Sequence, residues 1–166
     1  PEDGQTAEWF LKTHEIMESY GYSSYEISNF SKPKMECQHN LHYWRIHPYL
    51  AFGPSAHGFD GQNRWNNSRS MDHYLQQIES NKSPVSMKET LTQKDLLNEM
   101  IGFGLRMKEG INLSKIPEKF KNQFSGNLIV AEKKWEGCFI QTEKSISLTK
   151  TGMVYGDAIG VDLMVD

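Results

Sequence analysis

The sequence has 166 residues, enough for one domain or two small modules. Its 18 Lys and Arg residues and 21 Asp and Glu residues give a net charge of −3, which argues against a dedicated nucleic-acid-binding protein. No apolar run approaches the ~20 residues that span a bilayer. The two cysteines do not make a disulfide framework, so we expect a location in the reducing cytoplasm. Two cysteines are also too few to bind an iron–sulfur cluster.

The first part of the chain is predicted to form a helix and then a strand. Apolar residues at three- and four-residue spacing predict a helix over 6–19, which Gly21 ends. Aromatic residues and an isoleucine predict a short strand over 22–27. A polar loop is expected over 29–40, and residues 39–49 show no clean period. Helix, glycine and strand in this order are typical of half a βαβ unit.

The next segment is predicted to hold a strand that leads into a tight loop. The apolar run 50–53 predicts the strand, and the small residues of 54–58 predict the loop. Residues 60–63 indicate a turn, 64–66 a return strand and 71–80 a helix. Ligands of α/β folds bind at strand ends, so the loop is a candidate binding segment, although an ordinary tight turn explains it equally well.

Beyond a boundary expected at 81–84, the sequence predicts a mainly helical module. An apolar stripe predicts a helix from Thr92 to about Lys108. A short helical step, a helix, a hairpin and a last helix are then expected over 112–117, 127–135, 138–148 and 151–164. We therefore predict an α+β fold, with an α/β half-barrel remnant over 1–84 and a mainly helical, winged-helix-like domain over 85–166.

The densest group of metal-binding side chains lies near the middle of the first half. Three of the six histidines and one of the two cysteines occur there, namely His39, His42, His47 and Cys37. Histidine and cysteine are the usual ligands of haem iron and transition metals, and Tyr43 and Trp44 offer flat faces for a porphyrin. Two alternatives stay open: a surface loop whose aromatic residues cover a core edge, and a zinc site that lacks its second ligand pair.

Three segments in this order and spacing resemble the oxygen-independent coproporphyrinogen III oxidase family of radical S-adenosylmethionine (SAM) proteins. They are residues 25–30, 37–44 and 53–58. The pattern His-Asn-x-x-Tyr-Trp is closer to the haem-chaperone branch of that family, and it is matched by His39, Asn40, Tyr43 and Trp44. Weaker matches at 104–106 and 148–152 extend the resemblance over nearly the whole chain. Ser55 stands where the family loop often has its second glycine.

The resemblance implies a partial TIM-like barrel with a [4Fe–4S] cluster and SAM, followed by a mainly helical domain. The family's Cys-x-x-x-Cys-x-x-Cys motif is absent here, and the chain has no initiator methionine, so we expect a C-terminal fragment without catalytic residues or iron–sulfur ligands. In the longer parent, the residues expected to bind SAM are Gly53, Ser55, Ala56 and His57. The residues expected to bind haem are His39, as the iron ligand, with Asn40, Tyr43 and Trp44, while His42 and Cys37 are reserve ligands.

Two functions follow from the resemblance as expectations. The first is a haem chaperone that binds haem and delivers it to an acceptor protein. The alternative is the oxidase itself, which decarboxylates propionate side chains of a porphyrinogen to vinyl groups. We expect haem or porphyrinogen and a haem acceptor as partners and no nucleic acid, and membrane association of the parent stays open. The cut edge of a half-barrel also predicts strand pairing with a second copy.

Overall fold

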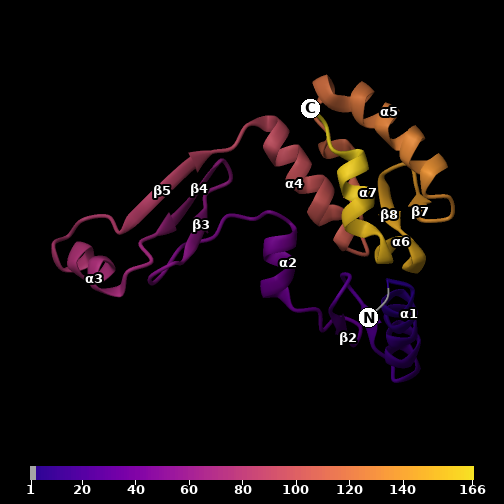
Figure 1. The fold of residues 1–166 in the computed structure, drawn as a ribbon, viewed down its shortest axis with the longest axis horizontal. Coiled ribbons are helices and arrows are strands. Elements are labelled where there is room, and N and C mark those ends of the chain that lie inside the picture. The colour runs from indigo at the N-terminus through magenta and orange to yellow at the C-terminus, as the bar shows by residue number, and fades with distance from the viewer. Residues whose placement is uncertain (1–2) are drawn as a thin grey trace. The chain divides into compact units, whose positions relative to one another are not determined.

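The computed structural model describes residues 3–166, which fall into two compact units. The first unit combines the residues up to Arg45 with Leu97–Asp166, and the second is Ile46–Leu96. Figure 1 labels the elements in chain order. None of the helices within 3–166 is long and apolar enough to cross a membrane.

The first unit begins with the predicted helix, confirmed as α1 (Asp3–Ser19). Gly21 ends it with φ +79°, and its N–H and that of Tyr22 donate to the carbonyls of Glu18 and Met17. The strand predicted over 22–27 is shorter than expected, because only β1 (Ser23–Ser24) pairs with β2 (Phe30–Ser31). Glu26 instead forms an isolated bridge with Met107, so this segment is joined to the C-terminal half of the unit.

A helix that was not predicted from the sequence follows the polar loop. It is α2 (Gln38–Trp44), and Leu41 is its only buried residue. A seven-residue helix with one buried position has no apolar stripe for periodicity to detect. The absence of a clean period over 39–49 thus concealed a short helix in the first half of that segment.

The C-terminal part confirms the α+β class. Its elements are α4 (Gln93–Arg106), β6 (Ile111–Asn112), a 3-10 turn η1 (Leu113–Lys115), α5 (Glu118–Lys134), β7 (Phe139–Gln141), β8 (Ser145–Leu148), α6 (Lys150–Val154) and α7 (Gly156–Leu163). The antiparallel sheet has the order β6-β8-β7, and the predicted hairpin is its β7–β8 pair. Two expectations were wrong in extent: α5 begins directly after Pro117, and the last helix is interrupted at Tyr155.

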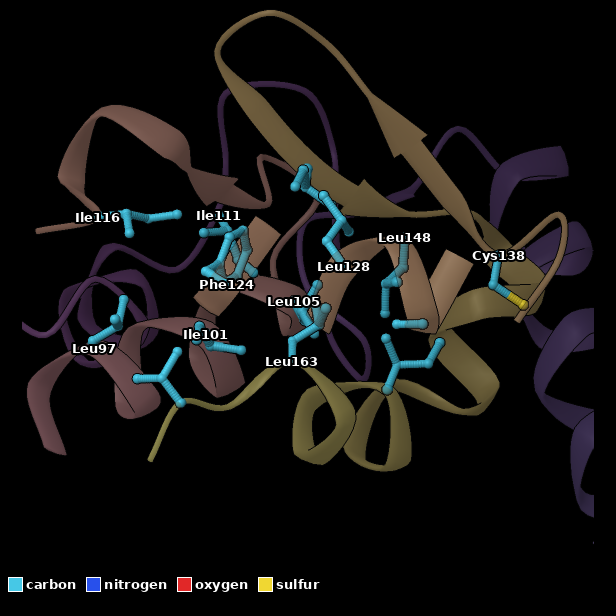
Figure 2. Close-up of a cluster of buried hydrophobic side chains, with 14 of the residues drawn as sticks. Leu97, Ile101, Leu105, Ile111, Ile116, Phe124, Leu128, Cys138, Leu148 and Leu163 are labelled. Carbon is cyan, nitrogen blue, oxygen red and sulfur yellow. The ribbon is translucent and has the colours of Figure 1, made fainter. Parts of the chain in front are cut away.

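The core of this unit lies between α4, α5, α7 and the sheet, as Figure 2 shows. Leu97, Ile101 and Leu105 supply one face of α4, as the apolar stripe predicted. Phe124 and Leu128 face them from α5. Each fully buried side chain of this size contributes ~1.5–3 kcal/mol of stability relative to exposure. This packing fixes the end of α4, from which the candidate site is built.

The second unit is a three-stranded antiparallel sheet and one helix. Its elements are β3 (His57–Phe59), β4 (Asn63–Asn67), α3 (Met71–Glu79) and β5 (Val85–Thr90), with strand order β3-β4-β5. The strand predicted over 50–53 is wrong, since only Tyr49 forms a bridge there, with Phe59. The tight loop therefore precedes β3 rather than ending a strand.

Strand β5 was not predicted, because all six of its residues are exposed and no alternation marks it. It follows the turn at 81–84, where the sequence placed a module boundary, and it pairs with β4, although α3 lies between the two strands in the sequence. The division into 1–84 and 85–166 stays a prediction. Both β3 and β5 are edges of this sheet, and the expected strand pairing with a second copy stays a prediction.

Candidate functional site

Helix α2 carries the His-Asn-x-x-Tyr-Trp motif, and its inner side is held by the segment after β1. Leu41 is buried in a small cluster with Tyr25 and Met107. The side-chain amide of Asn40 donates a hydrogen bond to the phenol oxygen of Tyr25 over 3.2 Å. The second motif residue thus has a structural partner within the first unit.

Trp44, the last motif residue, also lies on this inner side. Its ring is 5.6 Å from that of Phe103, in an edge-to-face arrangement, and the Arg106 guanidinium lies 5.0 Å from its centroid. A cation over an indole face contributes ~0.5–1 kcal/mol at exposed sites and more when desolvated. Trp44 therefore fastens α2 to the end of α4.

The other two motif residues lie on the outer face of α2. His39 and Tyr43 are exposed, four positions apart, and their rings meet edge to face with centroids 4.9 Å apart. The half-buried His42 approaches Tyr43 with a centroid distance of 6.1 Å. The motif thus divides into an anchoring pair, Asn40 and Trp44, and an exposed pair, His39 and Tyr43.

The carboxylate of Glu26, next to Tyr25 in the sequence, is completely buried in this part of the first unit. Glu26 accepts hydrogen bonds from the backbone N–H of Ser28 and from the side chain of Asn29. Its second oxygen has no hydrogen-bond partner and lies 4.0 Å from the Arg106 guanidinium. Arg106 thus provides the positive charge nearest this carboxylate in the contacts described for 3–166.

The two thiols do not fit an iron–sulfur cluster. Cys37 is exposed just before α2, whereas Cys138 is buried in the core, and burial raises the pKa of the Cys138 thiol. A cluster needs three or four thiolates, so this chain cannot hold one alone. No group of three or more His, Cys, Asp or Glu side chains within 3–166 is arranged to hold a metal ion.

The loop expected to bind SAM belongs to the second unit, and its backbone amides already have partners. The N–H of Gly53 donates to the Tyr74 hydroxyl, that of Ser55 to the Ser68 carbonyl, and that of Ala56 to the Gly53 carbonyl. Ser55 has φ +59°, in the left-handed region that favours the glycine of the family loop. The Ser55 hydroxyl and the exposed His57 side chain, rather than these three amides, are the groups left for a ligand.

The buried side chain of Asn67 stabilises the same loop through hydrogen bonds to its backbone. Its side-chain amide donates to the carbonyls of Ala51 and Gly53. Sequence reasoning missed Asn67 and Tyr74 as well as Tyr25, Phe103 and Arg106 in the first unit. Tyr25 and Arg106 lie in segments that carried the family resemblance, whereas no sequence signal marked Phe103, Asn67 or Tyr74.

Comparison with known proteins gives a consistent result. Residues 91–155 match the HemN C-terminal domain. The heme chaperone HemW of Bacillus subtilis is 30% identical over 161 residues, which are 96% of this chain and 42% of that protein. HemW of Lactococcus lactis is 32% identical over 124 residues, which are 75% of this chain and 32% of that protein. The matched part of this chain therefore spans about two fifths of the length of the Bacillus subtilis relative and about one third of the Lactococcus lactis relative.

The fold is also shared with a solved structure. Coproporphyrinogen III oxidase (HemN) from Escherichia coli, a radical SAM enzyme, superimposes with a TM-score of 0.74 and 19% identity. The match covers 99% of this chain and 42% of that protein, and at this identity it shows the fold alone. The domain match and the HemW relatives show that the chain belongs to the oxygen-independent coproporphyrinogen III oxidase-like family of radical SAM proteins, in its haem-chaperone branch.

Proposed function

We propose that the protein acts as a haem chaperone that binds haem at the exposed face of α2 and delivers it to an acceptor protein. The observation that carries the proposal is the division of the motif on α2. Asn40 and Trp44 fix the helix, and this leaves the His39 imidazole exposed beside the Tyr43 ring. The HemW relatives, which are named heme chaperones, support the same conclusion.

An exposed single ligand suits a cargo better than a permanent cofactor. Neutral imidazole is a common haem-iron ligand. One histidine on a surface helix binds iron from one side and leaves the second axial position available to a ligand from the acceptor. We assign His39 as the iron ligand and Tyr43 as the aromatic contact, with Asn40 and Trp44 as positioning residues. His42 and Cys37 are reserve ligands.

We further propose that the [4Fe–4S] cluster and SAM are bound in a longer parent polypeptide. The two thiols here do not fit the cluster, since one is exposed and the other lies in the core. The loop of Gly53, Ser55, Ala56 and His57 would contribute to the SAM site through the Ser55 hydroxyl and the His57 side chain, since three of its amides are occupied. Because both thiols are free, we place the protein in the reducing cytoplasm.

Haem transfer tests this proposal. The protein is loaded with haemin and mixed with apomyoglobin as a haem-free acceptor, and the Soret band of the acceptor is followed. We expect transfer from the unaltered protein and from a His73→Ala variant, which loses an exposed histidine of α3. We expect little loading, and hence little transfer, with His39→Ala. Failure of the unaltered protein to bind or release haemin would contradict the proposal.

The alternative function is that of a coproporphyrinogen III oxidase. The shared fold with the Escherichia coli enzyme supports it, but that similarity concerns the fold alone. The experiment that separates the two is anaerobic incubation of the parent protein with SAM, a reductant and coproporphyrinogen III. Release of carbon dioxide with formation of vinyl groups would favour the oxidase over the chaperone.

A further inference from the structure

A pocket of about 610 Å³ lies within the first unit between α1 and the start of α7. Phe10, Ile27 and Met153 give it apolar walls, and Arg106 and Asp157 are its charged lining residues. An apolar pocket with one or two charged groups is typical of sites for small amphipathic ligands. Neither the motif on α2 nor the SAM loop accounts for it.

Arg106 has unused capacity to bind an anion. A guanidinium carries five N–H donors, but the single hydrogen bond that the structure shows for this one is from Nη1 to Asp157, at 3.5 Å. Nη2 is 4.0 Å from Glu26, beyond hydrogen-bond distance, and Nε is buried without a partner. The planar fork of an arginine matches a carboxylate and binds it with two parallel hydrogen bonds.

Asp157 is a weak occupant of this fork. Its side chain is 92% exposed, and surface ion pairs of this kind contribute little to stability. It belongs to the first turn of α7, which begins at Gly156, where the helix dipole favours a negative charge. A carboxylate from a ligand could therefore replace the Asp157 carboxylate at Arg106 without breaking a strong contact.

Arg106 also connects the pocket to the motif helix. Its guanidinium lies 5.0 Å from the centroid of the Trp44 ring, so Arg106 contacts α2 and also lines the pocket. A ligand that combines an apolar ring with carboxylate side chains would satisfy both the apolar walls and the fork. Haem and its metal-free precursors have this chemistry, because their rings carry propionates.

We propose that Arg106 binds a propionate carboxylate of the tetrapyrrole, and that this carboxylate takes the place of Asp157. This inference rests on the proposed function, since it concerns the same cargo. It adds Arg106 as a second binding residue, which contacts the carboxylate, whereas His39 contacts the iron.

The test compares haemin with its dimethyl ester, in which the propionates are uncharged. We expect the unaltered protein to bind haemin about tenfold more tightly than the ester, as for a charge-assisted hydrogen bond. Arg106→Gln should remove this preference by weakening haemin binding alone. Asp157→Asn should strengthen haemin binding several-fold, because it removes the competing carboxylate, and should leave the ester unaffected. Metal-free protoporphyrin IX should show the same dependence on both variants.

Arg45→Gln is the matched control, because it removes another arginine of this unit, which pairs with Glu109. It should leave the preference unchanged. Equal affinity for haemin and ester, or weaker haemin binding in Asp157→Asn, would overturn the inference while the proposed function stands. Absence of haemin binding in the unaltered protein would overturn both. If Arg106→Gln does not fold, the inference is still tested by the affinity of the unaltered protein for the dimethyl ester and by haemin binding to the Asp157→Asn variant, whose substitution is exposed.

Discussion

The side chain of Asn40 reaches from α2 to the phenol oxygen of Tyr25, 15 positions earlier in the chain, and donates a hydrogen bond to it over 3.2 Å. Tyr25 is buried, and its own backbone carbonyl accepts a hydrogen bond from the N–H of Lys108 at 3.1 Å. Three segments that are distant in the sequence therefore meet at Tyr25. Through this residue α2 is joined to the segment that follows α4.

Tyr25→Phe should lower the free energy of unfolding by about 1 kcal/mol, because it leaves the Asn40 amide without its acceptor. The ring itself stays in place, so the fold should be kept. Urea denaturation followed by circular dichroism measures the change. Tyr20→Phe is the control, since Tyr20 is 75% exposed. An equal effect of the two substitutions would show that the hydrogen bond does not contribute.

Thr92 begins α4 through a reciprocal pair of contacts with Asp95. Its hydroxyl accepts from the N–H of Asp95, and the Asp95 carboxylate accepts from the N–H of Thr92. Thr92→Ala should destabilise the protein by ~0.5–2 kcal/mol, whereas Thr92→Ser keeps the hydroxyl and should cost little. Thermal unfolding of both variants tests this. Equal losses would mean that the methyl group, and not the cap, matters at this position.

Gly152 lies where a larger side chain has no room. A Cβ atom there would be 2.2 Å from the backbone carbonyl oxygen of Cys138. Gly152→Ala should therefore destabilise the protein by ~1–3 kcal/mol. Gly126 lies within α5, and a Cβ atom there would meet nothing within 4 Å, so Gly126→Ala should instead stabilise by ~0.5–1 kcal/mol. Chemical denaturation gives both signs, and a harmless Gly152→Ala would contradict the packing at α6.

His14 should make stability depend on pH. It is 1% exposed between the rings of Phe10 and Phe30, and burial, with a smaller effect of the Lys150 charge, lowers the pKa of its imidazole below 6.5. The unfolded chain therefore takes up a proton at a higher pH than the folded protein does. Stability from this residue is complete above the unfolded pKa of ~6.5 and is lost as the pH falls towards the folded pKa.

The free energy of unfolding should thus decrease as the pH falls below about 7. In a His14→Leu variant this decrease should be smaller, because the buried group no longer titrates. His39→Gln, which replaces an exposed histidine, should keep the full decrease. Denaturant titrations at several pH values measure these slopes. A steep slope that persists in His14→Leu would assign the pH dependence to other groups.

The elements best predicted from the sequence are those that bury one continuous face. The stripe of Leu97, Ile101 and Leu105 predicted α4, and the β7–β8 hairpin was found through its alternation. Helix α2 and strand β5 were missed because they bury one residue and none, respectively, so no periodicity marks them. The apolar run 50–53 led to a wrong prediction, since exposed Leu50 and Phe52 carry no strand.

The candidate site shows the same division. The resemblance to the family motif identified His39 and Asn40, because that pattern is local in the sequence. The contacts of Asn40 with Tyr25 and of Trp44 with Arg106 join positions far apart in the sequence, and only the fold brings them together. The separation of the motif into an anchoring and an exposed pair could not be predicted, because no periodicity in the sequence showed that the motif lies on a helix.

The most direct test of the account is the Soret spectrum during haemin titration of the unaltered protein, His39→Ala and His73→Ala. His39 is exposed, so its loss should leave the fold intact by circular dichroism. We predict that His39→Ala weakens haemin binding and removes or shifts the Soret band of the histidine-bound iron, whereas His73→Ala matches the unaltered protein. Unchanged affinity and spectrum in a folded His39→Ala variant would contradict the assignment of His39 as the haem ligand.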